Sequence, residues 1–265
     1  YLITVKLPIY QVDAFTSKLF SGNPAAVIPL ERDLSEQVMQ SIANENNLSE
    51  TAFINISQTP YTIRWFTPTT EVNLCGHATL ASAKILFEKH LDGDVNEIRF
   101  DSKSGELTAT KKNDLIFLDF PADVSVEISE TDFVVNLLGA EPNLLFKGRD
   151  DYLAIFQSEK IIRDLRPNFS EIAKIDSRGL IASAPGDDVD FVSRCFFPQT
   201  GINEDPVTGS AHTTMIPYWS AVFSKDELLA HQLSERGGII HCINKEDRVM
   251  IGGASLIYLS GEILV

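Results

Sequence analysis

The stretch RWFTPTTEVNLCGHATLASAKILFEK, residues 64–89, decides the fold. It begins at the end of an expected strand, continues through a polar loop to Gly76, and then takes on a helical composition. Almost every side chain in the first three turns of this helix is small or apolar. Because a helix that is apolar on nearly all faces is buried on nearly all faces, we predict a helix at 77–89 that is enclosed by a sheet.

The same pattern recurs 130 residues further along the chain, in RCFFPQTGINE at 194–204. Arginine, phenylalanine, proline, threonine and asparagine recur at five of the eleven matched positions, where chance would give roughly one. After a later three-residue insertion, Gly209 falls on Gly76, and a mostly apolar segment follows at 213–223. Repetition of strand, loop, glycine and buried helix predicts a duplicated unit and two related lobes.

The segments around these two loops alternate between strand and helix patterns. We expect strands at 10–15, 25–29, 51–56 and 61–66, a surface helix at 35–46 with Ser35 as its N-cap, and further strands within 97–120. Pro121 and the acidic run beyond it mark a lobe boundary.

Composition limits the classes of protein to which the chain can belong. The 265 residues are 44% hydrophobic and 22% charged, which is ordinary for a globular chain. A net charge of −15 repels polyanions and argues against nucleic acid or an anionic membrane surface as partners. No segment approaches the roughly 20 apolar residues that a membrane helix needs. Cys75, Cys195 and Cys242 are too widely spaced for a disulfide framework or a zinc pair, so we expect a cytoplasmic location and no metal.

The two loop-to-helix turns are candidates for binding an anion. If both halves fold alike, the two helix N-termini face one cleft, and each offers unpaired N–H groups and a partial positive charge. Gly76 and Gly209 permit close approach of the backbone, and Ser210 adds a hydroxyl donor. Such turns would let a chain of charge −15 hold a small carboxylate. The alternative is that both turns are only helix caps.

Reactive side chains gather near these turns. Pro206 biases Asp205 to an extended conformation that would present its carboxylate at the cleft rim, although a solvated loop aspartate is the alternative. The positive end of the helix dipole disfavours a charged imidazole, so we expect a neutral ring at His77. Glu50 stands at the start of an apolar strand. From composition alone, however, a glutamate is expected to be exposed.

Four segments of the chain, in order, resemble the phenazine biosynthesis PhzF-like family: QVDAFTSKLFSGNPAAV, NLSETAF, RWFTPTTEVNLCGHATLASA and GINEDPVTGSAH. The resemblance covers nearly the whole chain. It implies an α+β fold of the diaminopimelate epimerase-like type, in which two pseudo-symmetric lobes each wrap a curved mixed or antiparallel sheet around a central helix. The lobes would be 1–120 with a returning strand at about 256–265, and 121–255, with the active site in the cleft between them.

The same resemblance implies a function. The chain should be an isomerase that transfers a proton within a small unsaturated carboxylic acid, without a cofactor or metal, and it should form a homodimer. Glu50 matches the acid/base of the family, while His77 and Asp205 match residues that orient the substrate or assist proton movement. The turns at Gly76, Gly209 and Ser210 match those that contact the substrate carboxylate.

Two alternatives stay open. Epimerases and racemases of this fold use two opposed cysteines; Cys75 matches the first, but Thr208 stands at the second position, so a two-thiol racemase is not expected. Cys75 is then a secondary acid or a small buried bystander. The other alternative is a binding protein that retains the fold and catalyses nothing.

Overall fold

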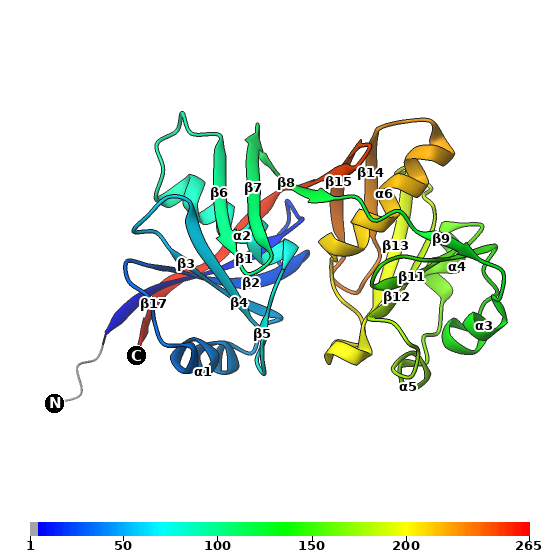
Figure 1. Cartoon of the computed structure of the whole chain (residues 1–265), viewed down its shortest axis with the longest axis horizontal. Coiled ribbons are helices and arrows are strands. Elements are labelled where there is room, and N and C mark those ends of the chain that lie inside the picture. The colour runs from blue at the N-terminus through cyan, green and yellow to red at the C-terminus, as the bar shows by residue number, and fades with distance from the viewer. Residues whose placement is uncertain (1–4) are drawn as a thin grey trace. The chain divides into compact units, whose positions relative to one another are not determined.

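The computed structural model describes residues 5–265. The chain divides into two compact units, one formed by Tyr1–Asp119 with Gly252–Val265 and the other by Phe120–Ile251. The chain therefore passes twice between them, and each unit is described by itself (Figure 1). None of the helices within residues 5–265 is long and apolar enough to cross a membrane.

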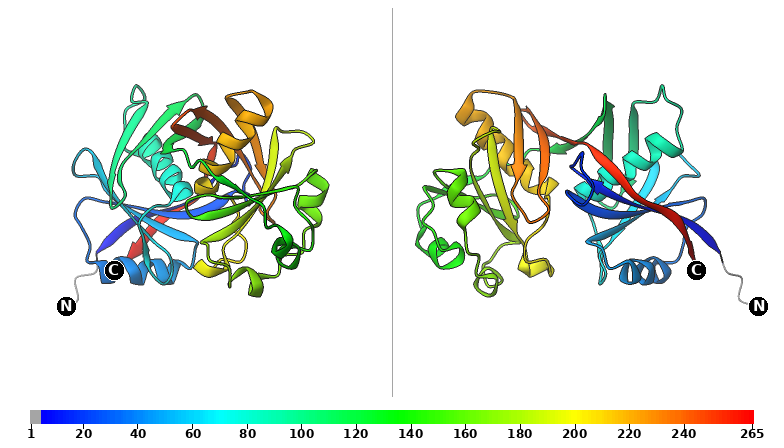
Figure 2. Two further views of the ribbon diagram at one scale, coloured as in Figure 1. Left: turned by 45° about the vertical axis from the view of Figure 1, so that its right-hand side comes forward. Right: turned by 180° about the vertical axis from the view of Figure 1, so that it is seen from behind.

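The first unit is a mixed sheet with two helices. Its strands are β1 (Lys6–Ala14), β2 (Asn23–Leu30), β3 (Glu50–Asn55), β4 (Tyr61–Phe66), β5 (Glu71–Val72), β6 (Glu97–Ser102), β7 (Gly105–Lys112), β8 (Leu115–Pro121) and β17 (Ser255–Leu264), and its helices are α1 (Glu36–Asn46) and α2 (Gly76–Lys89). The hydrogen-bonded order is β17, β1, β2, β3, β4, β6, β7. Figure 2 shows the C-terminal strand beside the N-terminal one.

Helix α2 lies against β1, β2, β3 and β17. Ten of its fourteen residues are buried, and small side chains at residues such as Ala78 and Ala81 let the strands approach it on several sides. The predicted enclosed helix is therefore confirmed. The predicted surface helix is also present as α1: the Ser35 side chain accepts a hydrogen bond from the Val38 N–H, and the helix buries one face against β3 and β4.

The second unit contains the remaining elements. Its strands are β9 (Val126–Ile128), β10 (Leu144–Lys147), β11 (Asp151–Ile155), β12 (Gly179–Pro185), β13 (Phe191–Phe196), β14 (Glu227–Gln232), β15 (Gly238–Lys245) and β16 (Arg248–Gly253), and its helices are α3 (Asp132–Leu138), α4 (Glu159–Asp164), α5 (Phe169–Ile172), a 3₁₀ turn (Pro198–Thr200) and α6 (Gly209–Phe223). One cluster of its core lies between α3, α4, α5 and the strands β10 to β13.

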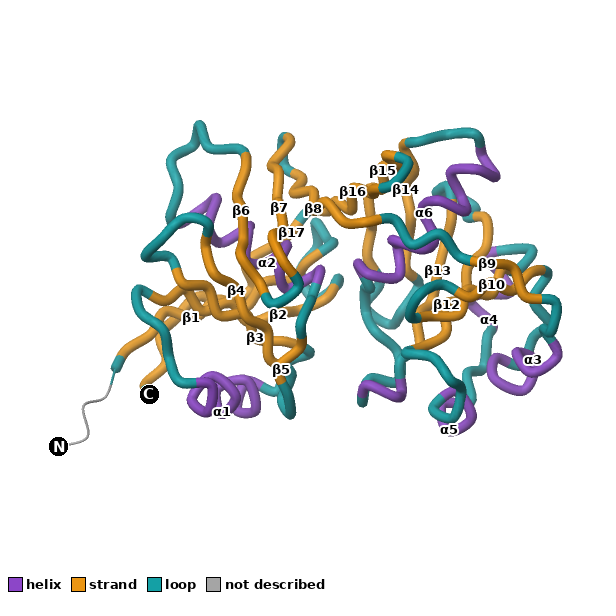
Figure 3. The backbone as a smooth tube through the Cα atoms, viewed as in Figure 1, coloured by secondary structure: helices purple, strands orange, loops and turns teal. Residues whose placement is uncertain are grey.

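The two sheets repeat one pairing scheme. In each unit the successive pairings are antiparallel, antiparallel, parallel, antiparallel, parallel and antiparallel. This holds for the order β9, β10, β11, β12, β13, β14, β15 and for the order β17, β1, β2, β3, β4, β6, β7. The long helix follows the fifth strand of the series in both units, as α2 after β4 and α6 after β13 (Figure 3). The predicted duplication is thus visible in the topology.

Helix α6 begins at Gly209, four residues before the start of the apolar segment expected at 213–223. The segment contains Pro217, which has no N–H to donate to the carbonyl four residues earlier. That carbonyl, on Thr213, accepts a hydrogen bond from the Asp123 N–H at 3.1 Å instead. Thr214 also donates to the Asp123 carboxylate, so the segment before α3 stabilises the interrupted turn of α6.

Candidate functional site

Three elements of the first unit bring polar side chains to the start of α2. Glu50 is the first residue of β3 and pairs with Ala25 in the parallel neighbour β2. Asn23 lies two residues before Ala25, so Asn23 and Glu50 point from the same face of the sheet. His77 is the second residue of α2, which packs on that part of the sheet.

The Glu50 and His77 side chains form a buried pair. Glu50 Oε2 lies 3.0 Å from His77 Nε2, and the side chains keep only 12% and 7% of their exposure. The other ring nitrogen, Nδ1, lies 3.2 Å from Nδ2 of Asn23. Composition had favoured an exposed Glu50, and this is wrong, because the apolar residues that follow it draw the start of β3 into the core.

His77 differs from the other histidines in the direction in which its pKa is shifted. Burial lowers the pKa of the His77 ring, but Cys75 and Glu50 oppose burial and raise that pKa well above its ordinary value. Burial also raises the pKa of the Cys75 thiol, and the Glu50 carboxylate acts on it in the same direction. The four other histidines, which also lie within residues 5–265, have lowered pKa values.

The neutral ring expected at His77 is therefore wrong while Glu50 is ionised. The expectation considered only the helix dipole, which places about half a unit charge at the helix start. A full carboxylate charge 3.0 Å from Nε2 outweighs it.

Cys75 completes the cluster without making it a metal site. One donor atom from each of Glu50, Cys75 and His77 lies within 4.8 Å of the others. Zinc would need them to converge on one point at about 2.0–2.3 Å. Cys75 Sγ, however, is nearly equidistant from the ring nitrogens, at 3.5 Å from Nδ1 and 4.0 Å from Nε2. In a flat ring this position lies off the lone-pair direction of the nitrogen that faces Glu50, so the three donors do not fit a metal ion.

A second cluster surrounds the start of α6 in the other unit. Thr208 is the N-cap of α6 and donates from its hydroxyl to Asp205 Oδ2 at 2.6 Å. Gln232 in β14 accepts from the Thr208 N–H at 2.9 Å and donates to the Asp205 carbonyl at 2.8 Å. Asp205 is 8% exposed, which excludes the alternative of a solvated loop aspartate.

The first residues of α2 and α6 are alike in their backbone. Neither N-cap side chain, of Cys75 or of Thr208, accepts a hydrogen bond from the first turn of its helix. Gly209 and Ser210 open α6 as Gly76 opens α2. No N-cap side chain occupies the first-turn N–H groups of either helix. Both helix starts can therefore donate these N–H groups to an anion.

Of the residues predicted from the sequence, Glu50, Cys75, Gly76 and His77 come together in the first unit, and Asp205, Thr208, Gly209 and Ser210 in the second. The sequence analysis missed Asn23 and Gln232. Asn23 stood in a quoted motif, where no functional role was given to it. Gln232 carried no signal, since nothing in its strand pattern indicates a contact with Thr208 24 residues earlier.

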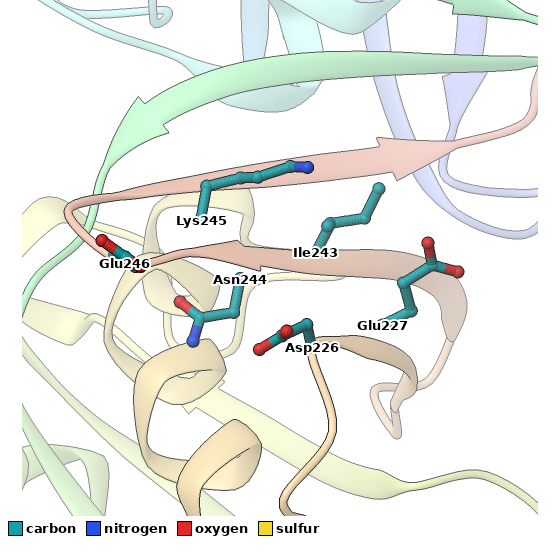
Figure 4. Close-up of a pocket in the computed structure, with 6 residues that line it drawn as sticks. All are labelled: Asp226, Glu227, Ile243, Asn244, Lys245 and Glu246. Carbon is teal, nitrogen blue, oxygen red and sulfur yellow. The ribbon is translucent and has the colours of Figure 1, made fainter.

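A hollow of about 460 Å³ lies elsewhere, in the second unit (Figure 4). Its lining residues are Asp226, Glu227, Ile243, Asn244, Lys245 and Glu246. It includes none of the candidate residues, and its three carboxylates against one lysine do not suit an anionic ligand. We therefore do not assign the function to it.

Comparison with known proteins identifies the family. A family model described as phenazine biosynthesis-like protein, PhzC-PhzF, matches residues 12–261. The chain belongs to this phenazine biosynthesis-like family. An uncharacterized isomerase of Halalkalibacterium halodurans is 47% identical over 262 residues, which cover 97% of this chain and 98% of the relative.

Solved structures agree with this membership. The crystal structure of a PhzF-family phenazine biosynthesis protein from Enterococcus faecalis matches with a TM-score of 0.95 at 45% identity, over 98% of this chain and 100% of that chain. A predicted epimerase from Pseudomonas aeruginosa has a TM-score of 0.72 at 18% identity, over 98% and 99% of the two chains, and shows likeness of fold alone. The expected α+β, diaminopimelate epimerase-like fold is thus confirmed.

Proposed function

We propose that this chain is an isomerase that moves a proton within a small unsaturated carboxylic acid, with Glu50 as the acid/base. The observation that carries the proposal is the pairing of Glu50 with His77 at 3.0 Å in a buried setting. The isomerase name of the relative from Halalkalibacterium halodurans supports the reaction class. A single carboxyl group can take a proton from one carbon and deliver it to another on the same face, so the step needs no cofactor.

His77 supports both halves of such a transfer. While Glu50 is a carboxylate, the charged ring balances it inside a buried site. When Glu50 takes the substrate proton it becomes neutral, and the substrate carries the negative charge that the charged His77 ring then balances. Before the substrate proton is taken, the single proton that the pair shares can lie on Glu50 or on His77 without changing the net charge of the pair.

The substrate carboxylate is assigned in this proposal to the helix starts. Gly76 and Gly209 have no Cβ to hold a ligand away from the backbone, and Ser210 adds a hydroxyl donor. Negative charge that develops along a conjugated acid would be stabilised by the same N–H groups. Asp205, held by Thr208 and Gln232, is proposed to orient the substrate or to assist the proton.

The test is proton exchange measured by NMR in deuterated buffer, with a panel of small unsaturated acids and amino acids. Deuterium should enter a conjugated acid with the wild-type protein and not with Glu50→Gln. Glu45→Gln is the matched control, since Glu45 is an exposed glutamate on α1 five residues earlier. A fully active Glu50→Gln variant would rule out Glu50 as the acid/base.

The same experiment separates the two alternatives. Exchange at the α-carbon of an amino acid that is lost in Cys75→Ser supports an epimerase. Saturable binding of a carboxylate with no exchange anywhere in the panel supports a binding protein.

A further inference from the structure

The position of Asn23 is fixed by the turn before it. Gly22 has a φ of 70°, and a Cβ at that residue would lie 2.2 Å from the Ala14 carbonyl oxygen. A glycine is needed there for the chain to turn from β1 into β2. Asn23 follows directly, pairs with Ala14 and is fully buried. Its side chain therefore enters the sheet at one defined place.

Asn23 and Glu50 each contact one of the two ring nitrogens of His77. Glu50 Oε2 is 3.0 Å from Nε2, and Asn23 Nδ2 is 3.2 Å from Nδ1. The two side chains come from neighbouring strands and the same sheet face, whereas His77 comes from the helix above. Rotation of the His77 ring about its Cβ–Cγ bond would break both contacts. Asn23 and Glu50 together therefore set the direction in which Nε2 points.

An asparagine suits a ring whose charge changes. Its NH₂ can donate to a bare Nδ1, and its carbonyl oxygen can accept from a protonated Nδ1–H after a half-turn of the amide. The half-turn exchanges the places of the Asn23 amide nitrogen and oxygen, so Asn23 can serve both the neutral and the charged ring from the same position. An aspartate would place carboxylates on both sides of His77 and keep it charged, while a leucine of similar volume would leave Nδ1 only the weaker contact with Cys75 Sγ at 3.5 Å.

We propose that Asn23 is the positioning residue for His77: it keeps Nε2 directed at Glu50 while allowing the ring to gain and lose charge. This rests on the proposed function, in which Glu50 changes charge and His77 responds. The groups that act electrostatically on the ring, among residues 5–265, are Cys75 at the helix start and Glu50 in β3. Asn23, on β2, is the neutral third neighbour.

The test follows His77 directly, by ring ¹⁵N NMR across pH in the ligand-free protein. Asn23→Asp should raise the pKa of His77 by about one unit, which is tenfold in proton affinity. Asn23→Leu should remove the single tautomer of the neutral ring and give a mixture. Asn46→Asp is the matched control, because Asn46 donates to Thr51 in β3 next to Glu50 and does not contact His77; its His77 titration should be close to that of the wild type.

Turnover gives the second readout. Asn23→Asp should reduce kcat more than it changes KM and should move the basic limb of the pH profile in the same direction as the His77 pKa. An unchanged His77 titration in Asn23→Asp, with loss of stability alone, would overturn the positioning role. If His77 responds to Asn23 as expected but Glu50→Gln retains turnover, the proposed function fails and the structural role of Asn23 stands.

Discussion

Arg64 in β4 and Arg194 in β13 make equivalent contacts in their own units. Each donates from Nε to a glutamate oxygen 2.7 Å away, on Glu71 in the first unit and on Glu204 in the second. Each guanidinium also lies over the ring of the phenylalanine two residues later, at 5.1 Å and 5.2 Å from the ring centroid. The ion pair connects the strand to the segment that leads into the long helix, and it is present in both units.

Arg194→Met should destabilise the protein more than Arg64→Met. Arg194 is 13% exposed against 26% for Arg64, and it also donates to the carbonyls of Ile162 and Leu165 at the end of α4. Its loss leaves a half-buried carboxylate and two carbonyls without that donor, at a cost of about 3 kcal/mol against about 1–2 kcal/mol for Arg64. Denaturant unfolding measures both, with the exposed Arg32→Met as control. Equal costs would contradict the argument.

Glu71 should contribute to stability only above acid pH. The Arg64 guanidinium lowers the pKa of Glu71, burial opposes this, and Lys103 adds to the lowering. A carboxyl whose pKa is lower in the fold stabilises it fully above about pH 4.5, and this contribution is lost as the pH falls through the lowered value. The stability difference between the wild type and Glu71→Gln should therefore shrink from pH 6 to pH 3. A constant difference would show that packing, not charge, is responsible.

Glu50→Gln should lower the pKa of His77. With the carboxylate gone, one of the two groups that oppose burial is lost, and burial is the largest single cause and lowers the pKa of the ring. In the wild type the raised pKa of His77 stabilises the fold fully below about pH 6.5 and loses this effect as the pH rises through the raised value. The stability deficit of Glu50→Gln should thus be larger at pH 6.5 than at pH 9. Unfolding curves at the two pH values check the direction, and a deficit that grows with pH would refute it.

The sequence predicted the fold well because its strongest signals are local. The apolar composition of 77–89, the Ser35 cap and the recurrence at 194–204 each reflect burial or backbone geometry within a few residues. The position of the insertion was harder. It was placed after Glu204, but the two arginine–glutamate pairs are 130 residues apart at the arginines and 133 at the glutamates, which puts the insertion before Glu204.

The candidate site depended more on long-range contacts. Glu50 and His77 were chosen through resemblance, and their separation of 27 positions gives no pattern that predicts a 3.0 Å pair. The charge of His77 was predicted wrongly because the dipole was visible in the sequence and the carboxylate beside the ring was not. Asn23, 54 residues from His77, is a neutral side chain in a turn motif, where the local role hides the distant one.

Gly22→Ala should destabilise the first unit and disturb the His77 cluster together. The residue has a left-handed φ of 70°, and the added Cβ would meet the Ala14 carbonyl oxygen at 2.2 Å. Strain from the left-handed conformation alone costs about 1–2 kcal/mol, and the close contact adds to it. Gly105→Ala is a matched control, since its φ is also positive, at 100°, but no atom lies within 4 Å of the added Cβ. Unfolding should show the larger loss for Gly22→Ala, and the His77 NMR signals should shift in that variant alone.

Cys75→Ser should keep most of the turnover. The sulfur lies beside the His77 ring, off the lone pair that faces Glu50, and burial raises the pKa of the thiol, so Cys75 is a poor base near pH 7. Serine preserves the shape of the site and removes the thiol. Exchange kinetics should therefore fall by no more than a few fold, against loss of activity in Glu50→Gln. A fall as large as that of Glu50→Gln would assign the proton transfer to the thiol instead, and the step would then be that of an epimerase in which Thr208 stands where the second cysteine is expected.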